Sequence, residues 1–299
     1  MSEVCKLKAL VTGGCGFVGS HLVDKLALAG YDVTVIDDLS SGSKKWNNSS
    51  AKYVYSDFTE ALSPFITSSK QELKDRNMLF DVVFHLAACA RIQPSFEEPH
   101  YTYKNNAFGT AVVAEFCRNQ GCKIVYSGSS SCYAGVYNTP YGFAKWQGEE
   151  VLKMYSSIFS LSTAIVRFFN VYGPRNPLIG EFTPVVAKFE TQYSKGDPLT
   201  IVGDGEQRRD FTHIDDICSG LLAISEGEWS GEIFNLGSGK NYSIKELANM
   251  FGGEIEYIAS RRGEADTTLA DISKTTELTG WVPKRSLPVY ISEIVGRPE

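Results

Sequence analysis

The 299-residue sequence lacks any long apolar run. No stretch approaches the roughly 18 consecutive apolar residues that a membrane-spanning helix needs. A signal peptide is not indicated either, because Lys6 and Lys8 interrupt the start of the chain and a strand-like run follows at once. We therefore expect a cytoplasmic protein that does not interact with a membrane.

Cysteine patterns typical of metal centres or secreted frameworks are also missing. The seven cysteines are scattered and include no C-x-x-C pair. An odd number without metal-ligand spacing is typical of reduced thiols in a cytosolic protein. The sequence shows no solenoid repeat and no low-complexity tract, and it predicts no metal site.

A positive charge excess is the third missing feature. The net charge is -6 and the pI is about 5.4, so no general attraction to nucleic acid or anionic membranes is expected. Any anionic ligand must therefore be held by a local site.

Short apolar or β-branched runs alternate with helical patterns over the first 170 residues. This alternation predicts right-handed crossovers and a Rossmann-type, doubly wound parallel sheet, which makes the fold class α/β. The predicted helices are Gly16–Ala29, Asn105–Asn119 and Gly142–Ser156. The predicted strands are Leu7–Thr12, Asp32–Asp37, Tyr53–Ser56, Val82–Leu86, Lys123–Ser127 and Thr163–Phe169.

The pattern loosens after Gly173-Pro174, where prolines interrupt it and the later strands, Ile233–Leu236 and Ile255–Ile258, are short. We expect a smaller α+β substrate-binding domain over residues 171–299, beside a dinucleotide-binding domain over residues 1–170. The segments near 212–227 and 266–275, including Ile214–Ser225 and Leu269–Ser273, are expected to return to the first domain.

A glycine-rich turn, Thr12–Gly19, follows the first predicted strand and opens the first predicted helix. Gly13, Gly16 and Gly19 permit a tight turn, close approach to a pyrophosphate and tight helix–strand packing. The N–H groups and dipole of the helix start can then receive phosphates. The second strand ends in Asp37-Asp38, where an acid can bind ribose hydroxyls and repel a 2′-phosphate, which favours NAD over NADP.

Each polar residue at this predicted site also has a plain structural interpretation. Asp37 could be a cap or turn residue, and Asp57, placed to meet the adenine, could be a solvated turn aspartate. Asn106 could cap a helix instead of supporting the site.

Tyr141 and Lys145 are four residues apart, so on a helix they share one face. Tyrosine has a pKa of about 10, and nearby positive charge from a lysine and an oxidised nicotinamide would lower it toward neutrality. The alternative is a surface helix pair. A serine-rich strand end, Tyr126–Tyr133, precedes the pair, and a serine there could bridge the tyrosine and a substrate hydroxyl.

With these residues in place, the chain resembles the extended short-chain dehydrogenases/reductases, specifically the nucleotide-sugar epimerase/dehydratase family. The resemblance runs nearly end to end. It rests on T-G-G-x-G-F-x-G at Thr12–Gly19, H-L-A-A at His85–Ala88, N-x-x-G-T at Asn106–Thr110, Y-x-x-x-K at Tyr141–Lys145, R-F-F-N-V-Y-G-P at Arg167–Pro174, G-D-G-E-Q-x-R-D-F at Gly203–Phe211, R-x-G-E at Arg261–Glu264 and A-D-I-S-K with a following G-W at Ala270–Trp281.

The resemblance implies that NAD is the cofactor and that the substrate is a nucleotide sugar, most similar to the UDP-linked sugars of this family. Tyr141, as phenolate, takes the sugar 4-hydroxyl proton with Ser129 bridging, and Lys145 completes the catalytic set. The implied cofactor contacts are Gly13, Gly16, Phe17, Val18, Gly19, Asp37, Asp38, Asp57, Phe58, Leu86, Ala87, Ala88, Asn106, Tyr141 and Lys145. The implied substrate contacts are Arg91, Ser129, Ser130, Ser131, Tyr141, Asn170, Arg209, Arg261 and Thr268. For Arg209 and Arg261 the alternative is that they form salt bridges on the surface.

Within the family, dehydratases place an Asp-Glu pair after the hydroxyl residue, whereas this chain has Ser130, Ser131 and Cys132 there. An acid typical of decarboxylases is absent as well. Both features favour NAD-dependent C4 epimerisation of a UDP-hexose or UDP-N-acetylhexosamine through a 4-keto sugar. The alternatives are a dehydratase or reductase of the same family, or a non-catalytic member, although such proteins commonly lose the tyrosine or lysine that this chain keeps.

Two departures from the family pattern bear on the substrate. Only seven residues separate Tyr133 from Tyr141, where relatives usually have a loop about ten residues longer. Thr268 occupies a position where a bulky tyrosine blocks N-acetylated sugars, so a small residue there suggests that they fit.

Relatives usually form homodimers through two helices, here near Asn105–Asn119 and Gly142–Ser156. The apolar set Val151, Leu152, Tyr155 and Ile158 could serve that interface or the monomer core.

Overall fold

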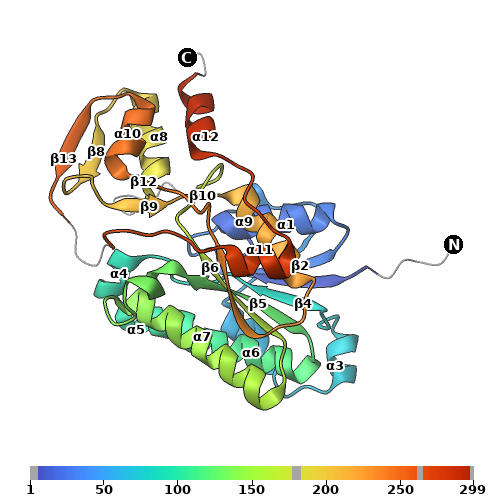
Figure 1. Cartoon of the computed structure of the whole chain (residues 1–299). Coiled ribbons are helices and arrows are strands. Elements are labelled where there is room, and N and C mark those ends of the chain that lie inside the picture. Colours follow the sequence, from blue (N-terminus) through green and yellow to red (C-terminus); the bar gives the residue numbers. More distant parts are fainter. Residues whose placement is uncertain (1–5, 177–182, 261–264, 297–299) are drawn as a thin grey trace.

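The computed structural model describes residues 6–176, 183–260 and 265–296, and it has a central sheet, helices on both faces and a smaller lobe to one side (Figure 1). All neighbouring strands of the sheet are parallel, as predicted for this α/β fold. The strand order across the sheet is β11 (Ser230–Leu236), β6 (Thr163–Phe168), β5 (Lys123–Ser129), β4 (Val82–His85), β1 (Lys8–Thr12), β2 (Asp32–Asp37) and β3 (Lys52–Tyr55).

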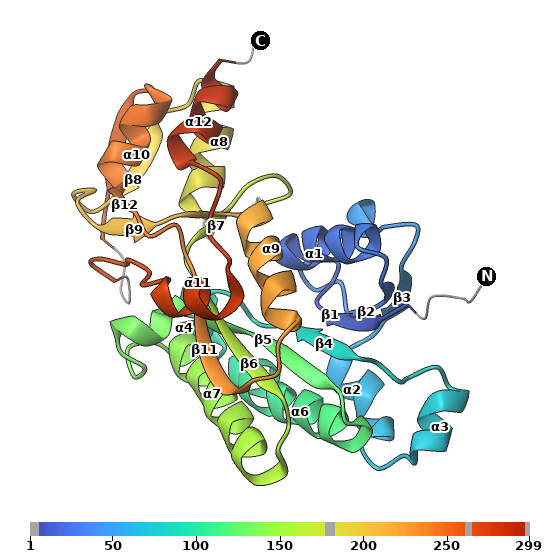
Figure 2. The same ribbon diagram turned by 45° about the vertical axis from the view of Figure 1, so that its right-hand side comes forward.

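Two separate apolar cores bind the helical layers to the sheet (Figure 2). On one face, the helices that pack on the strands are α1 (Phe17–Leu28) and α9 (Ile214–Ser225). On the other face they are α2 (Phe58–Leu62), α3 (Lys70–Asp75), α6 (Gly109–Gln120) and α7 (Pro140–Phe159). Burial on both faces explains why the strands are apolar throughout rather than alternating.

Short elements connect these layers. They are the 3₁₀ turns η1 (Lys44–Trp46), η2 (Ser63–Phe65) and η4 (Ser130–Ala134), the helices α4 (Ile92–Glu97), α5 (Pro99–Tyr103) and α11 (Ser273–Thr279), and the π-helical turn η3 (Lys104–Phe108). None of the helices in the described residues is long and apolar enough to cross a membrane.

The smaller lobe has its own core, in which Phe189, Ile201 and Phe251 are buried. Strands β7 (Val171–Tyr172) and β10 (Thr212–His213) pair in parallel at the connection to the large sheet. The lobe consists of α8 (Val185–Lys195), β8 (Leu199–Val202), β9 (Arg208–Asp210), β12 (Asn241–Ser243), α10 (Ile244–Phe251), β13 (Ile255–Ile258) and α12 (Leu287–Val295). This is the expected α+β portion.

One strand differs from the expectation. Ile233–Leu236, assigned from sequence to the smaller lobe, belongs to β11 and pairs with β6 in the large sheet. Its apolar side chains Phe234 and Leu236 are fully buried in the core under α9, which explains the placement. The chain after residue 170 therefore contributes strand β11 to the large sheet, and it also contributes the predicted helix α9, which packs on that sheet. The domain limits themselves stay a prediction.

Candidate active site

The glycine turn lies between β1 and α1, and each glycine has a different steric environment. Gly13 has φ +73°, and a Cβ there would lie 2.7 Å from the Ala87 nitrogen. A Cβ on Gly19 would lie 2.0 Å from the Gly13 oxygen, whereas one on Gly16 would meet nothing closer than 3.3 Å. Gly16 is the N-cap of α1, and no side chain caps that helix start. The turn thus leaves the helix N-terminus open to a phosphate, and the residues present fit a dinucleotide.

Asp37 is the last residue of β2, and its carboxylate hydrogen-bonds the backbone of the glycine turn. Its carboxylate accepts hydrogen bonds from the backbone N–H groups of Cys15 (2.9 Å) and Leu39 (2.8 Å). Burial raises the pKa of Asp37, and these two hydrogen bonds oppose that effect. The residue therefore serves the turn, and its remaining lone pairs leave the predicted ribose contact open. Asp38 is exposed and accepts from the Ser40 backbone at 2.9 Å.

The other predicted cofactor residues have partners of their own. Asp57 caps α2 through the Thr59 N–H (2.7 Å), a structural role different from the solvated turn aspartate considered from the sequence, and its adenine contact stays a prediction. The Phe58 ring is buried 5.2 Å from the His85 ring, which leaves chiefly its backbone for a cofactor contact. Asn106 does not cap a helix. It bonds both backbone groups of Cys89, at 2.8 and 3.0 Å, and so supports the loop after β4.

A buried histidine joins this loop to the glycine turn. His85 Nδ1 lies 2.8 Å from the Thr12 hydroxyl and Nε2 lies 3.3 Å from the Thr110 hydroxyl. Thr110 donates its own proton to the Asn106 carbonyl at 2.7 Å, so the network assigns the histidine proton to Nε2. Burial lowers the pKa of His85 to about 3, and the ring is neutral. The H-L-A-A segment, with Leu86, Ala87 and Ala88 partly exposed, is therefore positioned by neutral hydrogen bonds.

Tyr141 and Ser129 meet at the carboxyl end of β5. The Ser129 hydroxyl hydrogen-bonds the Tyr141 side chain, and it also lies 3.0 Å from the Ser131 hydroxyl. Burial raises the pKa of Tyr141, and Ser129 opposes this rise. In this structure Ser129 is the group that lowers the pKa of Tyr141, and the contribution of Lys145 together with an oxidised nicotinamide stays a prediction.

The Lys145 ammonium contacts Ser127 and Tyr126 in this structure. Its Nζ donates to the Ser127 hydroxyl at 3.4 Å and lies 4.4 Å from the centre of the Tyr126 ring. Burial lowers the Lys145 pKa to about 8, and the negative charge of Glu149 opposes this effect. A lysine so placed is still mostly protonated at neutral pH and can hold a further ligand at the strand end.

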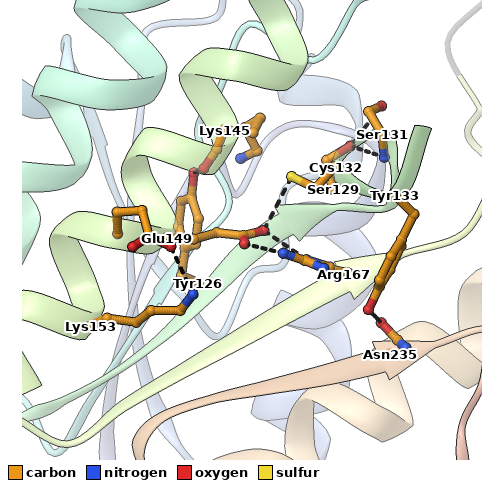
Figure 3. Close-up of polar contacts among 11 residues, drawn as sticks. Tyr126, Ser129, Ser131, Cys132, Tyr133, Lys145, Glu149, Lys153, Arg167 and Asn235 are labelled. Carbon is orange, nitrogen blue, oxygen red and sulfur yellow. Dashed lines mark hydrogen bonds and ion pairs between the residues drawn. The ribbon is translucent and has the colours of Figure 1, made fainter. Parts of the chain in front are cut away.

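A polar cluster that the sequence analysis did not identify lies behind these residues (Figure 3). The carboxylate of Glu149 is fully buried and accepts from Arg167 Nε at 3.0 Å and from Cys132 Sγ at 3.7 Å. Tyr133 lies over the Arg167 guanidinium at 4.5 Å and donates to Asn235 at 2.9 Å. The spacing from Lys145 to Glu149 is four residues and would have been the signal for it.

A cavity of about 380 Å³ lies between the carboxyl edge of the sheet and the smaller lobe. It brings together Arg91, Ser130, Ser131, Asn170, Arg209 and Thr268, six of the predicted substrate contacts that are far apart in sequence. Lining residues that the sequence analysis had not selected are Asn138, Thr139, Lys188, Thr200 and Gln207. The described lining contains three cationic side chains and no acid, which suits an anionic ligand.

Contacts inside the cavity wall fix two of the predicted residues. Asn170 donates to the Asp210 carbonyl at 2.7 Å and to the Thr268 hydroxyl at 3.2 Å. The same hydroxyl accepts from the Asp210 N–H at 3.2 Å. Arg209 Nη1 donates to the Arg208 carbonyl at 3.0 Å. Arg261, the other predicted diphosphate arginine, lies outside the described residues.

The family of the chain follows from comparison with known proteins. Residues 9–237 match the sequence model of the NAD dependent epimerase/dehydratase family. The chain belongs to this family.

Similarity to individual members extends over almost the whole chain. A UDP-glucose 4-epimerase of Mycolicibacterium smegmatis is 31% identical over 97% of both chains. The crystal structure of a UDP-glucose 4-epimerase from Thermotoga maritima with UDP-glucose is 32% identical, covers 97% of both chains and superposes with a TM-score of 0.88. UDP-glucuronic acid decarboxylase 4 of Arabidopsis thaliana is 29% identical over 96% of this chain and 68% of its own length. The names of these relatives refer to UDP-sugars and to more than one reaction, epimerisation and decarboxylation.

Proposed function

We propose that the protein is an NAD-dependent 4-epimerase of a nucleotide-diphosphate sugar, either a UDP-hexose or a UDP-N-acetylhexosamine. The observation that carries this proposal is the Ser129–Tyr141 hydrogen bond at the carboxyl end of β5, on the helix that carries Lys145 and next to Ser130 and Ser131, which line a cationic cavity. The relatives named UDP-glucose 4-epimerase support it.

Proton transfer at the sugar C4 hydroxyl falls to Tyr141 in this proposal. Ser129 already hydrogen-bonds the phenol, so it can bridge the phenol and the substrate hydroxyl. Bound NAD would supply the hydride acceptor and donor for C4, together with a positive ring charge that favours the phenolate. Lys145 holds the strand end through Ser127 and contributes a second positive charge. A 4-keto sugar results, and its reduction from the opposite face gives the epimer.

The glycine turn and the ends of β2, β3 and β4 would hold NAD. Gly13, Gly16 and the first turn of α1 would take the pyrophosphate, since that helix start is uncapped. Asp37 would reach the ribose with the lone pairs that its backbone contacts leave. Arg209, at the far end of the cavity, would hold the diphosphate, for which a guanidinium fork is suited.

The residues after Ser129 favour epimerisation over elimination or decarboxylation. Ser130 and Ser131 line the cavity but are not acids at neutral pH, and burial together with Glu149 raises the pKa of Cys132 to about 12. The nearest carboxylate, Glu149, is fully buried and paired with Arg167. No acid at these described positions can therefore protonate a leaving group on the sugar.

The activity test is incubation of the purified protein with a panel of UDP-, GDP- and dTDP-sugars, including UDP-N-acetylglucosamine and UDP-glucuronate. An epimeric product should form without added cofactor. Stoichiometric consumption of NADH would instead indicate a reductase, loss of water a dehydratase, and release of carbon dioxide a decarboxylase. Any of these three results would refute the proposal.

The matching residue test is Tyr141→Phe, which removes one hydroxyl. We expect kcat to fall by about 10²- to 10⁴-fold, because a positioned general base contributes about that factor. Dinucleotide binding and the thermal midpoint should stay near the parent values. Activity within a few-fold of the parent would show that Tyr141 does not transfer the proton.

The oligomeric state is also a proposal, based on the resemblance to the family and on the exposure of apolar residues on α7. Leu152 is fully buried in the monomer core, and Val151 and Tyr155 pack against it. Ile158, in contrast, is 65% exposed at the end of α7. We propose a cytoplasmic homodimer in which α6 and α7 of each subunit form the interface.

A further inference from the structure

Glu149 is a buried acid directly behind the predicted catalytic pair, and the proton transfers proposed above do not use it. It follows Tyr141 by eight residues and Lys145 by four on helix α7, so the three share one side of the helix. Its side chain is fully buried, and Figure 3 shows it beside Tyr126 and Lys145. A buried charge is costly unless its partners are well placed, so a specific role is expected.

The carboxylate is fixed in one geometry. Arg167 donates from Nε to Oε1 at 3.0 Å and from Nη2 to Oε2 at 2.5 Å, and bidentate pairs of this kind are directional. Cys132 donates to Oε1 at 3.7 Å from the turn that follows the site strand. Tyr133, over the guanidinium, and its hydroxyl bond to Asn235 of β11 hold the arginine in turn.

Contact with the site strand is direct. A Cβ on Gly128 would lie 2.8 Å from Glu149 Oε1, so only glycine lets the carboxylate lie against this strand. Gly128 separates Ser127, which accepts from Lys145, and Ser129, which bonds Tyr141. The acid therefore contacts the segment that carries both hydroxyl partners of the catalytic pair.

The charge of Glu149 also acts on both members of the pair. It raises the pKa of Lys145, because an anion favours the ammonium form, and it raises the pKa of Tyr141, because an anion disfavours the phenolate. The other described groups that face Lys145 are neutral at neutral pH. They are His85 from β4, Tyr126 from β5, Cys89 after β4, Cys132 from η4 and Tyr141 from α7 itself.

We propose that Glu149 is a positioning residue: held by Arg167, it fixes the Ser127–Ser129 strand end against Tyr141 and places its negative charge one helical turn from Lys145. The kinetic consequences rest on the proposed epimerase function. The charge coupling between Glu149 and Lys145 does not, and it can be measured without any substrate.

The test compares Glu149→Gln with Glu150→Gln. The control residue is the next one on α7, is exposed and pairs with Lys153 at 2.7 Å on the surface. The titration midpoint of Lys145 is followed by ¹³C NMR of labelled lysine, with the resonance identified by its loss in Lys145→Arg. The midpoint should fall by about one pH unit in Glu149→Gln and stay in place in Glu150→Gln.

The pH profile of kcat then separates a positioning role from a merely structural one. Activity requires Tyr141 deprotonated, which sets the acid limb, and Lys145 protonated, which sets the basic limb. Removing the negative charge lowers both pKa values, so both limbs should move to lower pH. With the Lys145 midpoint falling from about 8 to about 7, the protonated fraction of Lys145 at pH 7, and kcat with it, should fall by about twofold. A structural defect alone would lower kcat and leave both limbs in place.

The unpaired Arg167 could prevent Glu149→Gln from folding. Glu149→Gln/Arg167→Gln then replaces it, because this pair buries no net charge, and the Lys145 midpoint should fall in the same direction. A midpoint equal to that of the Glu150→Gln control in a folded variant would overturn the inference. If no sugar of the panel is epimerised but the midpoint falls, the proposed function fails and the coupling stands.

Discussion

Tyr141 illustrates how the surroundings of one side chain change its chemistry. Burial raises the pKa of its phenol and Ser129 opposes this effect, so the protein alone does not make it a strong base at neutral pH. Lys145 is directed at Ser127 and Tyr126 instead. In the proposed mechanism the residue would become a competent base only together with the positive charge of a bound cofactor, which would link proton transfer to NAD binding.

Thr268 is the residue on which we base the expected sugar preference. It lines the cavity, and its hydroxyl bonds Asn170 and the Asp210 backbone. Thr268→Tyr should fill the space for an N-acetyl group and lower kcat/KM for UDP-N-acetylglucosamine about tenfold more than for UDP-glucose. Activity on the two sugars, measured side by side, gives the ratio.

Loss of the Thr268 hydrogen bonds would affect both sugars alike. Thr268→Val removes the hydroxyl with little change in volume and is the control for that loss. An equal decrease for both sugars in Thr268→Tyr would contradict the proposed preference.

At the scale of the element, the three glycines of the turn before α1 have different structural roles. Gly13 is required by its positive φ and by the Ala87 backbone, and Gly19 by the Gly13 oxygen. Gly16 has the most room of the three, because its built Cβ meets only the Gly13 oxygen at 3.3 Å. The fold therefore leaves room at position 16, and the proposed pyrophosphate would occupy that space.

Two substitutions separate the roles within that turn. Gly19→Ala should destabilise the fold by about 1–3 kcal/mol, because its methyl group overlaps backbone. Gly16→Ala should keep the thermal midpoint within a few degrees and weaken NAD binding at least tenfold, because its methyl group occupies the pyrophosphate position. Thermal unfolding and calorimetric titration with NAD provide the two readouts. Unchanged NAD affinity in Gly16→Ala would show that the phosphates bind elsewhere.

Helix α7 shows a comparable division of roles along one element. Tyr141, Lys145 and Glu149 follow at four-residue spacing, so each full turn presents one functional group to the end of β5. Gly148 lets the helix come close, since a Cβ there would lie 2.5 Å from the Tyr126 hydroxyl. The backbone packing and the chemistry of the site thus depend on the same helix face.

At the scale of the whole molecule, the cavity exists only because two lobes meet. Arg91 and Ser130 lie in the segments that follow strands β4 and β5 of the large sheet, whereas Arg209 and Thr268 come from the far part of the chain. A site of this kind binds a long ligand at both ends, which is what a sugar linked to a nucleotide diphosphate requires.

The dimer proposal is tested at this scale. Ile158→Glu places a charge on the exposed end of α7 and should convert a dimer to a monomer, measured by light scattering coupled to size exclusion. Val289→Glu, at a residue 56% exposed on α12 in the other lobe, should leave the mass unchanged. A parent protein that is already monomeric would refute the proposal.

The sequence by itself determined the sheet, the glycine turn and the helix that carries Tyr141 and Lys145, since these depend on local periodicity and on residues close together in the chain. Six of the seven strands and the spacing of Tyr141 and Lys145 needed nothing more. Tertiary structure alone decided that β11 joins the large sheet, because its burial depends on a distant helix. It also decided that Lys145 points to Ser127 and that Glu149 meets Arg167, since side-chain partners across separate elements leave no periodic signal in a single sequence.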